Sequence, residues 1–122
     1  MKPIPDPWTI ADIERLLEAS ADDAETLAWI AVCVSMDPPE EDAPGWAERV
    51  CLSLADHEDR WVRGAAVLGF GHLARTAGVI HDPVRVRAVV DAGLKDPEPH
   101  VNGHATSALD DLSHFLGWRP TP

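Results

Sequence analysis

An internal repeat with an offset of 39 residues constrains the fold of this chain more than any other feature. The segments 59–73 and 98–112 align without a gap, and small and apolar residues recur at matched positions. Repetition at a period of roughly 20 to 50 residues is typical of stacked supersecondary units, and a unit of about 40 residues indicates helix pairs. The matched residues are Val62 and Val101, Gly64 and Gly103, Ala66 and Ala105, and Leu73 and Leu112.

Six helical segments follow from the spacing of apolar positions and from the turn residues between them. Thr9 and Asp12 form the pattern of a capping box at the start of the first segment. We expect Ser20 to cap the second, Gly78 to end the fourth in a left-handed conformation, and Asp82 to cap the fifth. The expected segments are 9–19, 22–36, 44–55, 59–76, 82–94 and 99–117.

These segments predict an all-α protein, a short α-solenoid of three helix pairs. The pairs cover about 9–36, 44–76 and 82–117 of a single domain, 1–122. A chain of 122 residues with 45% hydrophobic residues is able to bury a core. The first pair fits the repeat phase without its motif, as terminal repeats commonly do.

The stretch 54–69 resembles a HEAT-like repeat, whose second helix follows an acidic turn with a valine-arginine pair, small residues and leucine. The third pair departs from this pattern, because Asn102 replaces the arginine and His104 an alanine. The wider pattern, including Val62-Arg63-Gly64 and 69–75, is similar to small bacterial HEAT-repeat immunity proteins of polymorphic-toxin and contact-dependent inhibition systems. This resemblance implies a protein that binds and neutralises a cognate toxin.

The formal net charge of -11 is concentrated in the first half of the chain. Residues 1–59 contain 15 acidic against 3 basic residues, which gives -12, whereas residues 60–122 contain 6 against 7, which gives +1. An acidic field attracts basic partners and repels nucleic acid and anionic membranes, although acidity also serves solubility alone. We therefore expect a basic protein partner, and neither nucleic acid nor a membrane.

The sequence features that bear on compartment predict a cytoplasmic protein. The first residues lack the apolar region of a signal peptide, and no run approaches the roughly 18 apolar residues of a membrane helix. Cys33 and Cys51 lie in apolar helical patterns, where a free cysteine acts as a small hydrophobic residue. We expect free thiols, and a monomer is favoured, although the sequence leaves the oligomeric state open.

Neither a catalytic centre nor a cofactor is expected. His100 and His104 have the four-residue spacing of zinc ligands on one helix face, with His114 further along. No glutamate lies between the first two, and a third ligand would have to come from elsewhere, so surface histidines are the favoured interpretation. The chain also lacks a phosphate-binding loop, a nucleophile elbow and a dinucleotide motif, which predicts that it is not an enzyme.

The second helix of each pair is expected to line a concave surface that binds the partner. The repeat phase places Gly64 and Gly71 on the outward face of the fourth segment, beside tryptophan and arginine, which are enriched at binding hot spots. The alternative is that these glycines permit close packing and that the tryptophans belong to the core. The predicted partner-binding residues are Asp22, Glu25, Trp29, Glu40, Glu41, Asp42, Trp61, Leu68, Arg75, His100, Asp110 and His114.

The leading functional hypothesis is a non-enzymatic protein-binding module, specifically an immunity protein that neutralises a bacterial toxin in the cytosol. If the toxin is a nuclease, its basic channel would suit the acidic residues of the first half. The alternative is a HEAT-like adaptor or accessory subunit of a cellular complex. A metal-dependent activity would require the histidines of 99–117 to converge with a carboxylate.

Overall fold

A computed structural model of the protein describes residues 4–122, and these form an all-α fold with six helices. None of the helices in this part of the chain is both long and apolar enough to cross a bilayer. The sequence-based segments are confirmed to within about two residues at each end. The helices are α1 (Ile10–Ala19), α2 (Ala24–Met36), α3 (Trp46–Leu54), α4 (Arg60–Thr76), α5 (Pro83–Leu94) and α6 (Pro99–Leu116).

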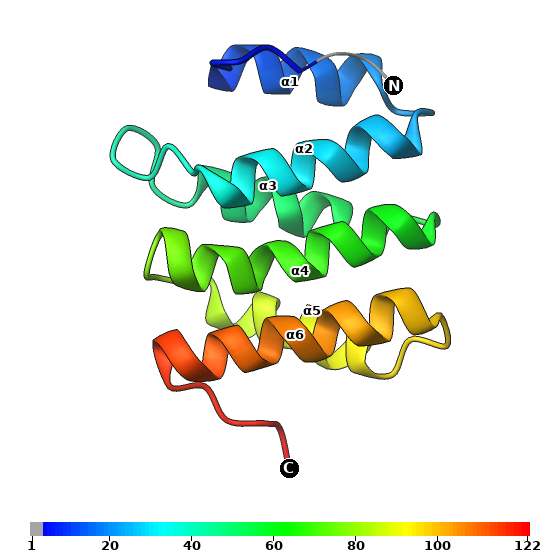
Figure 1. The fold of residues 1–122 in the computed structure, drawn as a ribbon, viewed down its shortest axis with the longest axis vertical. Helices are drawn as coiled ribbons and strands as arrows, with labels where there is room; N and C mark the ends of the chain where they lie inside the picture. The colour runs from blue at the N-terminus through cyan, green and yellow to red at the C-terminus, as the bar shows by residue number, and fades with distance from the viewer. Residues whose placement is uncertain (1–3) are drawn as a thin grey trace.

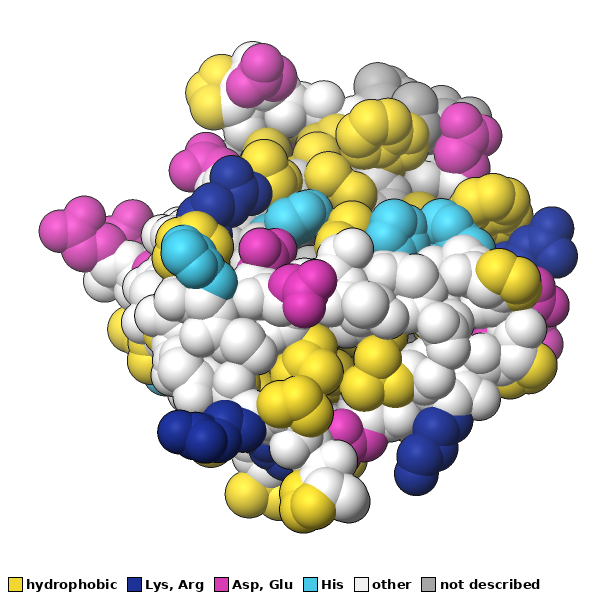
Figure 2. Space-filling model, turned by 60° about the horizontal axis from the view of Figure 1, so that its bottom comes forward, with side chains coloured by type: hydrophobic (Ala, Val, Ile, Leu, Met, Phe, Trp, Pro, Cys, Tyr) yellow, Lys and Arg dark blue, Asp and Glu magenta, His cyan; other side chains and the backbone are white. Residues whose placement is uncertain are grey.

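The helices stack in order along the long axis of the molecule, with the chain ends at opposite ends of the stack (Figure 1). Helices α2, α4 and α6 lie side by side in one layer, and α3 and α5 lie behind them. Helix α4 is central, because it packs against α2 and α6 on its two sides and against α3 and α5. Figure 2 shows hydrophobic and histidine side chains gathered across one face of this stack.

Local capping explains most helix ends. The Thr9 hydroxyl accepts the Asp12 N–H and the Asp12 carboxylate accepts the Thr9 N–H, which completes the predicted capping box. The Asp82 carboxylate accepts the Arg85 N–H at 3.2 Å and opens α5, as predicted. Gly78, with a φ of 70°, follows the end of α4 and donates its N–H to the Leu73 carbonyl at 3.1 Å. These helix ends were readable from sequence because each depends on residues within one turn.

Two details at helix starts differ from the prediction. Ser20 is buried at the end of α1, and it is the Asp23 carboxylate that caps α2 by accepting the Thr26 N–H at 3.1 Å. Helix α3 begins at Trp46 and not at 44, because Gly45 has a φ of 79° and therefore cannot belong to the helix. Asp23 lies three residues before Thr26, whose N–H group it caps, whereas Ser20 lies further from that group along the chain.

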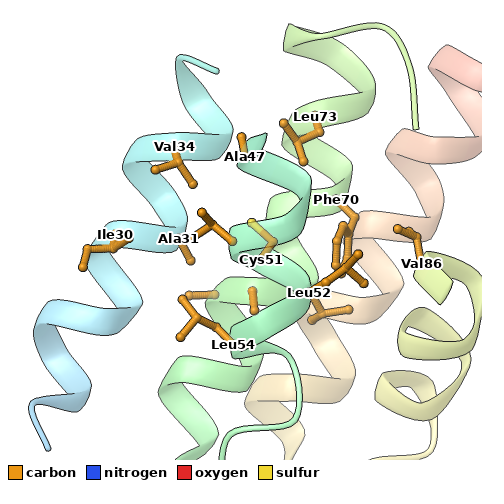
Figure 3. Packing of buried hydrophobic residues seen from close by; sticks show 14 of the residues in the cluster. Ile30, Ala31, Val34, Ala47, Cys51, Leu52, Leu54, Phe70, Leu73 and Val86 are labelled. Atoms are coloured by element: carbon orange, nitrogen blue, oxygen red, sulfur yellow. The ribbon is translucent and has the colours of Figure 1, made fainter. Parts of the chain in front are cut away.

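A continuous hydrophobic core joins the two layers. Figure 3 shows side chains of α2, α3, α4 and α5 pointing toward one another, with Phe70 and Cys51 among them. Both residues are fully buried. Burial, with a smaller contribution from Glu48, raises the pKa of the Cys51 thiol to about 12. Cys33 is partly exposed, and both cysteines are free thiols that pack as small apolar groups.

Two polar contacts join the second helix pair to the third. Arg63 forms a two-pronged ion pair with Asp96, at 3.0 Å and 3.3 Å, which lowers the pKa of that carboxyl group. Glu48 is only 3% exposed, and its two carboxylate oxygens accept the backbone N–H groups of His81 (2.7 Å) and Asp82 (2.8 Å). Both contacts fix the position of the turns that lead into α5 and α6.

The chain after α6 folds back onto α5. The Arg87 guanidinium lies 4.5 Å from the centre of the Trp118 ring and also donates to the Arg119 carbonyl at 2.8 Å. The Thr121 hydroxyl donates to the Asp91 carboxylate at 2.9 Å. The end of the third helix pair is therefore covered by a short segment rather than by a further helix in the part of the chain that the structure describes.

Glycine at position 71 sets the separation of α4 and α6. A Cβ atom there would lie 2.9 Å from the Ala108 Cα, which is closer than real Cβ contacts allow. The prediction that Gly71 faces outward is therefore wrong, since this residue is buried beneath α6. Helix α4 has a neighbouring helix on each side, and the repeat phase alone does not distinguish residues that face these neighbours from residues that face solvent.

Gly71→Ala is expected to destabilise the protein by about 1 to 3 kcal/mol, because the added methyl group forces two helix backbones apart. Gly103→Ala is the matched control, since Gly103 is exposed in α6 and a Cβ there meets nothing within 4 Å. The control is expected to raise the free energy of unfolding by about 0.5 to 1 kcal/mol through helix propensity. Urea unfolding followed by circular dichroism measures both. Equal stabilisation by the two variants would contradict the packing argument.

Candidate functional site

An open groove lies between α2, α4 and α6 on the face away from α3 and α5. It has a volume of about 590 Å³, which is in the range of ligand sites in proteins. Its lining is mostly apolar, with one carboxylate and two imidazoles. We call it the α2–α4–α6 groove. It is lined by Ala24, Glu25, Ala28, Trp29, Val32, Trp61, Ala65, Leu68, His100 and His104.

The repeat brings the lining residues together. Positions separated by 39 residues occupy the same place on neighbouring helices, so residues of three helices converge on one hollow. Alanine at 28 and 65 keeps the middle of the groove open. The equivalent lining pairs are Trp29 on α2 and Leu68 on α4, Trp61 on α4 and His100 on α6, and Ala65 on α4 and His104 on α6.

Two tryptophans form the rim. Trp29 is 47% exposed and Trp61 is 50% exposed, which leaves about half of each large side chain in water. The alternative that these residues belong to the core is therefore wrong. Large aromatic side chains left open beside an apolar hollow are typical of surfaces that bind another molecule.

The His100 side chain packs directly against the backbone of Gly64. A Cβ atom at Gly64 would lie 2.6 Å from His100 Cδ2 and 3.1 Å from His104 Cδ2. The prediction of Gly64 as an outward contact residue is wrong, because the two histidine rings cover it. His100 in turn packs on Trp61, with ring centroids 4.2 Å apart, and on His104, at 4.4 Å. The imidazoles thus continue the aromatic surface from α4 onto α6.

The pKa values of His72 and His104 lie below the ordinary value for histidine. Burial, together with the neighbouring His100, lowers the pKa of His104. Burial also lowers the pKa of His72, with further lowering by Arg75 and His104 and an opposing effect of Asp111. A lowered pKa favours the neutral form of the His104 imidazole, which lines the groove, at pH 7.

A serine and a histidine lie within hydrogen-bonding distance beside the groove, with 3.0 Å between Ser35 Oγ and His72 Nδ1. The Ser35 hydroxyl also lies 2.7 Å from the Ala31 carbonyl, and the tautomer of His72 sets which residue donates in the Ser35–His72 pair. Ser35 is also fully buried. A serine nucleophile would need an exposed hydroxyl. The pair therefore ties α2 to α4.

Glu25 contributes the carboxylate of the groove. It lies in the first turn of α2, one turn before Trp29, and its side chain is exposed. Among the residues that the structure describes, neither lysine nor arginine lines the groove. Glu25 therefore places a carboxylate next to aromatic and aliphatic surface.

The structure brings five of the predicted partner-binding residues together at the groove. These are Glu25, Trp29, Trp61, Leu68 and His100. Asp22 is exposed just before α2 and does not line the groove. Asp110 is exposed on α6, likewise outside the groove lining.

The remaining predicted residues lie near the other end of α2, α4 and α6. Glu40 contacts His81 and accepts the Gly45 N–H at 3.2 Å, so this carboxylate holds a loop. Its neighbours Glu41 and Asp42 are exposed. At the helix ends, Arg75 lies 3.4 Å from the sulfur of Met36, and His114 packs on Phe115 at 4.6 Å; the structure does not join these residues to the groove.

The predicted partner-binding residues leave out half of the groove lining. Three of the omitted residues are alanines, which are small and carry no signal of function by themselves, and the repeat phase placed a fourth, Val32, on the same face. His104 was weighed as a metal ligand and favoured as a surface histidine, although its position 39 residues after Ala65 marks the groove surface. Within residues 4–122, no group of three or more histidine, cysteine, aspartate and glutamate side chains is arranged to hold a metal ion.

Comparison of the chain with protein-family models, with curated proteins and with solved structures finds no match. The groove is therefore interpreted from its own geometry.

Stability is expected to fall as the pH drops below about 6.5, because His72 and His104 take up protons in the unfolded chain before they do so in the folded protein. The pKa values of both histidines are lower in the folded protein than in the unfolded chain. Their contribution to stability is therefore fully present at pH values above the unfolded pKa, and it is lost as the pH falls through the folded pKa. Urea unfolding of the wild type and of His104→Gln at pH 7.5 and 5.5 tests this. The variant is expected to lose less stability on acidification, whereas His114→Gln, at an exposed site, serves as control. An equal loss in His104→Gln and the wild type would contradict it.

Proposed function

We propose that this protein is a non-enzymatic protein-binding module that docks its partner in the α2–α4–α6 groove. The observation that carries the proposal is the pair of half-exposed tryptophans on the rim of an open apolar hollow. Tryptophan is the residue most enriched at interface hot spots, and exposed aromatic surface is costly to leave in water. The groove volume of about 590 Å³ has room for side chains from a helix or an extended segment of a partner.

The chemistry of the candidate nucleophiles supports a binding role. The Cys51 thiol, with its pKa of about 12, is almost entirely protonated at neutral pH, and a thiolate is the reactive form. The Ser35 hydroxyl is buried and faces a backbone carbonyl. Neither group lines the groove.

In its finer form, the proposal is that the partner is a basic bacterial toxin and that the protein is an immunity-type inhibitor with a HEAT-like fold, acting in the cytosol. Support comes from the charge of -12 on residues 1–59 and from the resemblance of 54–69 to a HEAT-like repeat. The acidic half includes α2 and therefore one wall of the groove. A field of this sign steers a basic protein toward the groove.

Photo-crosslinking in living cells tests the docking site. A photoreactive phenylalanine derivative at position 29 or 61 is expected to give one discrete protein adduct, since both positions lie on the groove rim. The same group at Val84, which is 80% exposed on α5, is the matched control. An adduct formed only from position 84, or none from positions 29 and 61, would contradict the proposal. A toxin encoded beside this gene as the captured protein supports immunity, whereas a subunit of a cellular complex indicates an adaptor.

The association rate with the captured partner is expected to fall about tenfold or more between 50 and 500 mM salt, because mobile ions screen long-range attraction. Stopped-flow measurement of tryptophan fluorescence provides the rate. Replacement of the exposed Glu41 and Asp42 by glutamine and asparagine should lower the rate at low salt and leave dissociation nearly unchanged. A rate that does not depend on salt would remove the electrostatic part of the proposal.

A further inference from the structure

Trp29 differs from the other tryptophans of residues 4–122 in its surroundings. Trp8 and Trp46 pack on each other at 6.0 Å, Trp61 packs on His100, and Trp118 lies under Arg87. Within residues 4–122, no other ring and no cation lies against Trp29. Its indole is nevertheless 47% exposed and lines the groove. The face of Trp29 is thus open to a ligand.

A carboxylate that forms no ion pair with residues 4–122 lies on the same helix as this ring. Glu25 precedes Trp29 by four residues on α2, which places both side chains on the same helix face. Among residues 4–122, Glu25 forms no ion pair. Both residues line the same groove, with Ala28 and Val32 between and beyond them along α2. An aromatic face, an aliphatic floor and a carboxylate therefore follow one another along one helix.

The protein already contains a filled arrangement of the same kind. The Arg60 guanidinium lies 5.4 Å from the centre of the Trp61 ring, and its Nη1 atom is 3.5 Å from the Glu98 carboxylate. Tryptophan and glutamate together thus hold an arginine. Trp29 and Glu25 offer the same two groups on α2, and no cation of residues 4–122 lies against Trp29.

We infer that Trp29 and Glu25 form a subsite for a basic side chain, arginine or lysine, of the partner protein. The cation lies over the indole face, where the negative charge of the ring attracts it, and pairs with the Glu25 carboxylate. The methylene stem covers Ala28 and Val32, as long basic side chains do on apolar surface. The lowered pKa of His104 favours its neutral form at pH 7, so this imidazole does not repel the cation. This inference rests on the proposed function and names the chemistry that the groove recognises.

Four acetylated pentapeptides of the form Ala-Leu-X-Leu-Ala test the subsite in the intact chain, with arginine, lysine, citrulline or norleucine at X. Binding is followed by the indole N–H resonance of Trp29 in a nitrogen-15 spectrum at pH 7.5. The arginine or the lysine peptide is expected to bind about fivefold or more tightly than the citrulline and norleucine peptides. Comparison of arginine with lysine identifies which cation the subsite prefers.

Glu25→Gln is expected to weaken binding of the basic peptide by about fivefold and to leave the norleucine peptide unchanged. Trp29→Leu keeps apolar volume, and peptide binding to it is followed by the indole N–H resonance of Trp61 in the same groove. This variant should abolish the preference for arginine over citrulline. Glu18→Gln, at an exposed position of α1 outside the groove, is the matched control and should change nothing. Circular dichroism checks that each variant is folded.

Equal binding of all four peptides at Trp29 would overturn the subsite for a cation while leaving the groove as a docking site. An absence of any shift of the Trp29 resonance would also overturn the subsite, and the proposed function would then depend on the crosslinking result alone. An unchanged affinity of the basic peptide for Glu25→Gln would show that the carboxylate plays no part.

Discussion

The fold depends on how closely other helices approach α4. Three glycines of α4 lie so close to a neighbouring helix that a Cβ atom would come within 2.6 to 2.9 Å of an atom of that helix. Gly64 and Gly71 face α6, and Gly69 faces Cys51 of α3. Glycine lowers the helix propensity of a 17-residue helix at each such position. The loss is offset because α4 then packs against four helices instead of two. Helix α4 therefore contacts most of the other helices that form the hydrophobic core.

The groove is a consequence of the same arrangement. Where α2, α4 and α6 lie side by side, large residues would fill the space between them, but Ala28 and Ala65 leave it empty. Gly64 leaves room for the His100 ring, which packs in a tilted arrangement against Trp61. The face of the layer therefore stays apolar and open, while the charge that surrounds it comes from α2 and the loop after it.

The sequence predicted those features that depend on near neighbours or on the repeat. Helix ends at Gly78 and Asp82 follow from chemistry within one turn, and the 39-residue offset correctly placed Trp61 and His100 on one surface. The same offset misplaced Gly64 and Gly71, because phase gives a direction around a helix and does not say how near the next helix lies. Charge composition does not show where an acidic side chain points. Glu40 was therefore predicted to contact the partner, although its carboxylate accepts the Gly45 N–H and holds a loop. The alanines of the groove have no sequence feature that marks them as functional, because they contribute to the groove only by being small.

The repeat also bears on how the surface of such a protein diverges. Trp29 and Leu68, Trp61 and His100, and Ala65 and His104 already show three different exchanges at equivalent positions within one chain. Core positions such as Val62 and Val101 are meanwhile identical. Residues that face the groove can therefore change in size, aromaticity and charge from one helix pair to the next while the helices remain stacked. New recognition can arise on this scaffold by substitution at a few exposed positions, without any need to rebuild the interior.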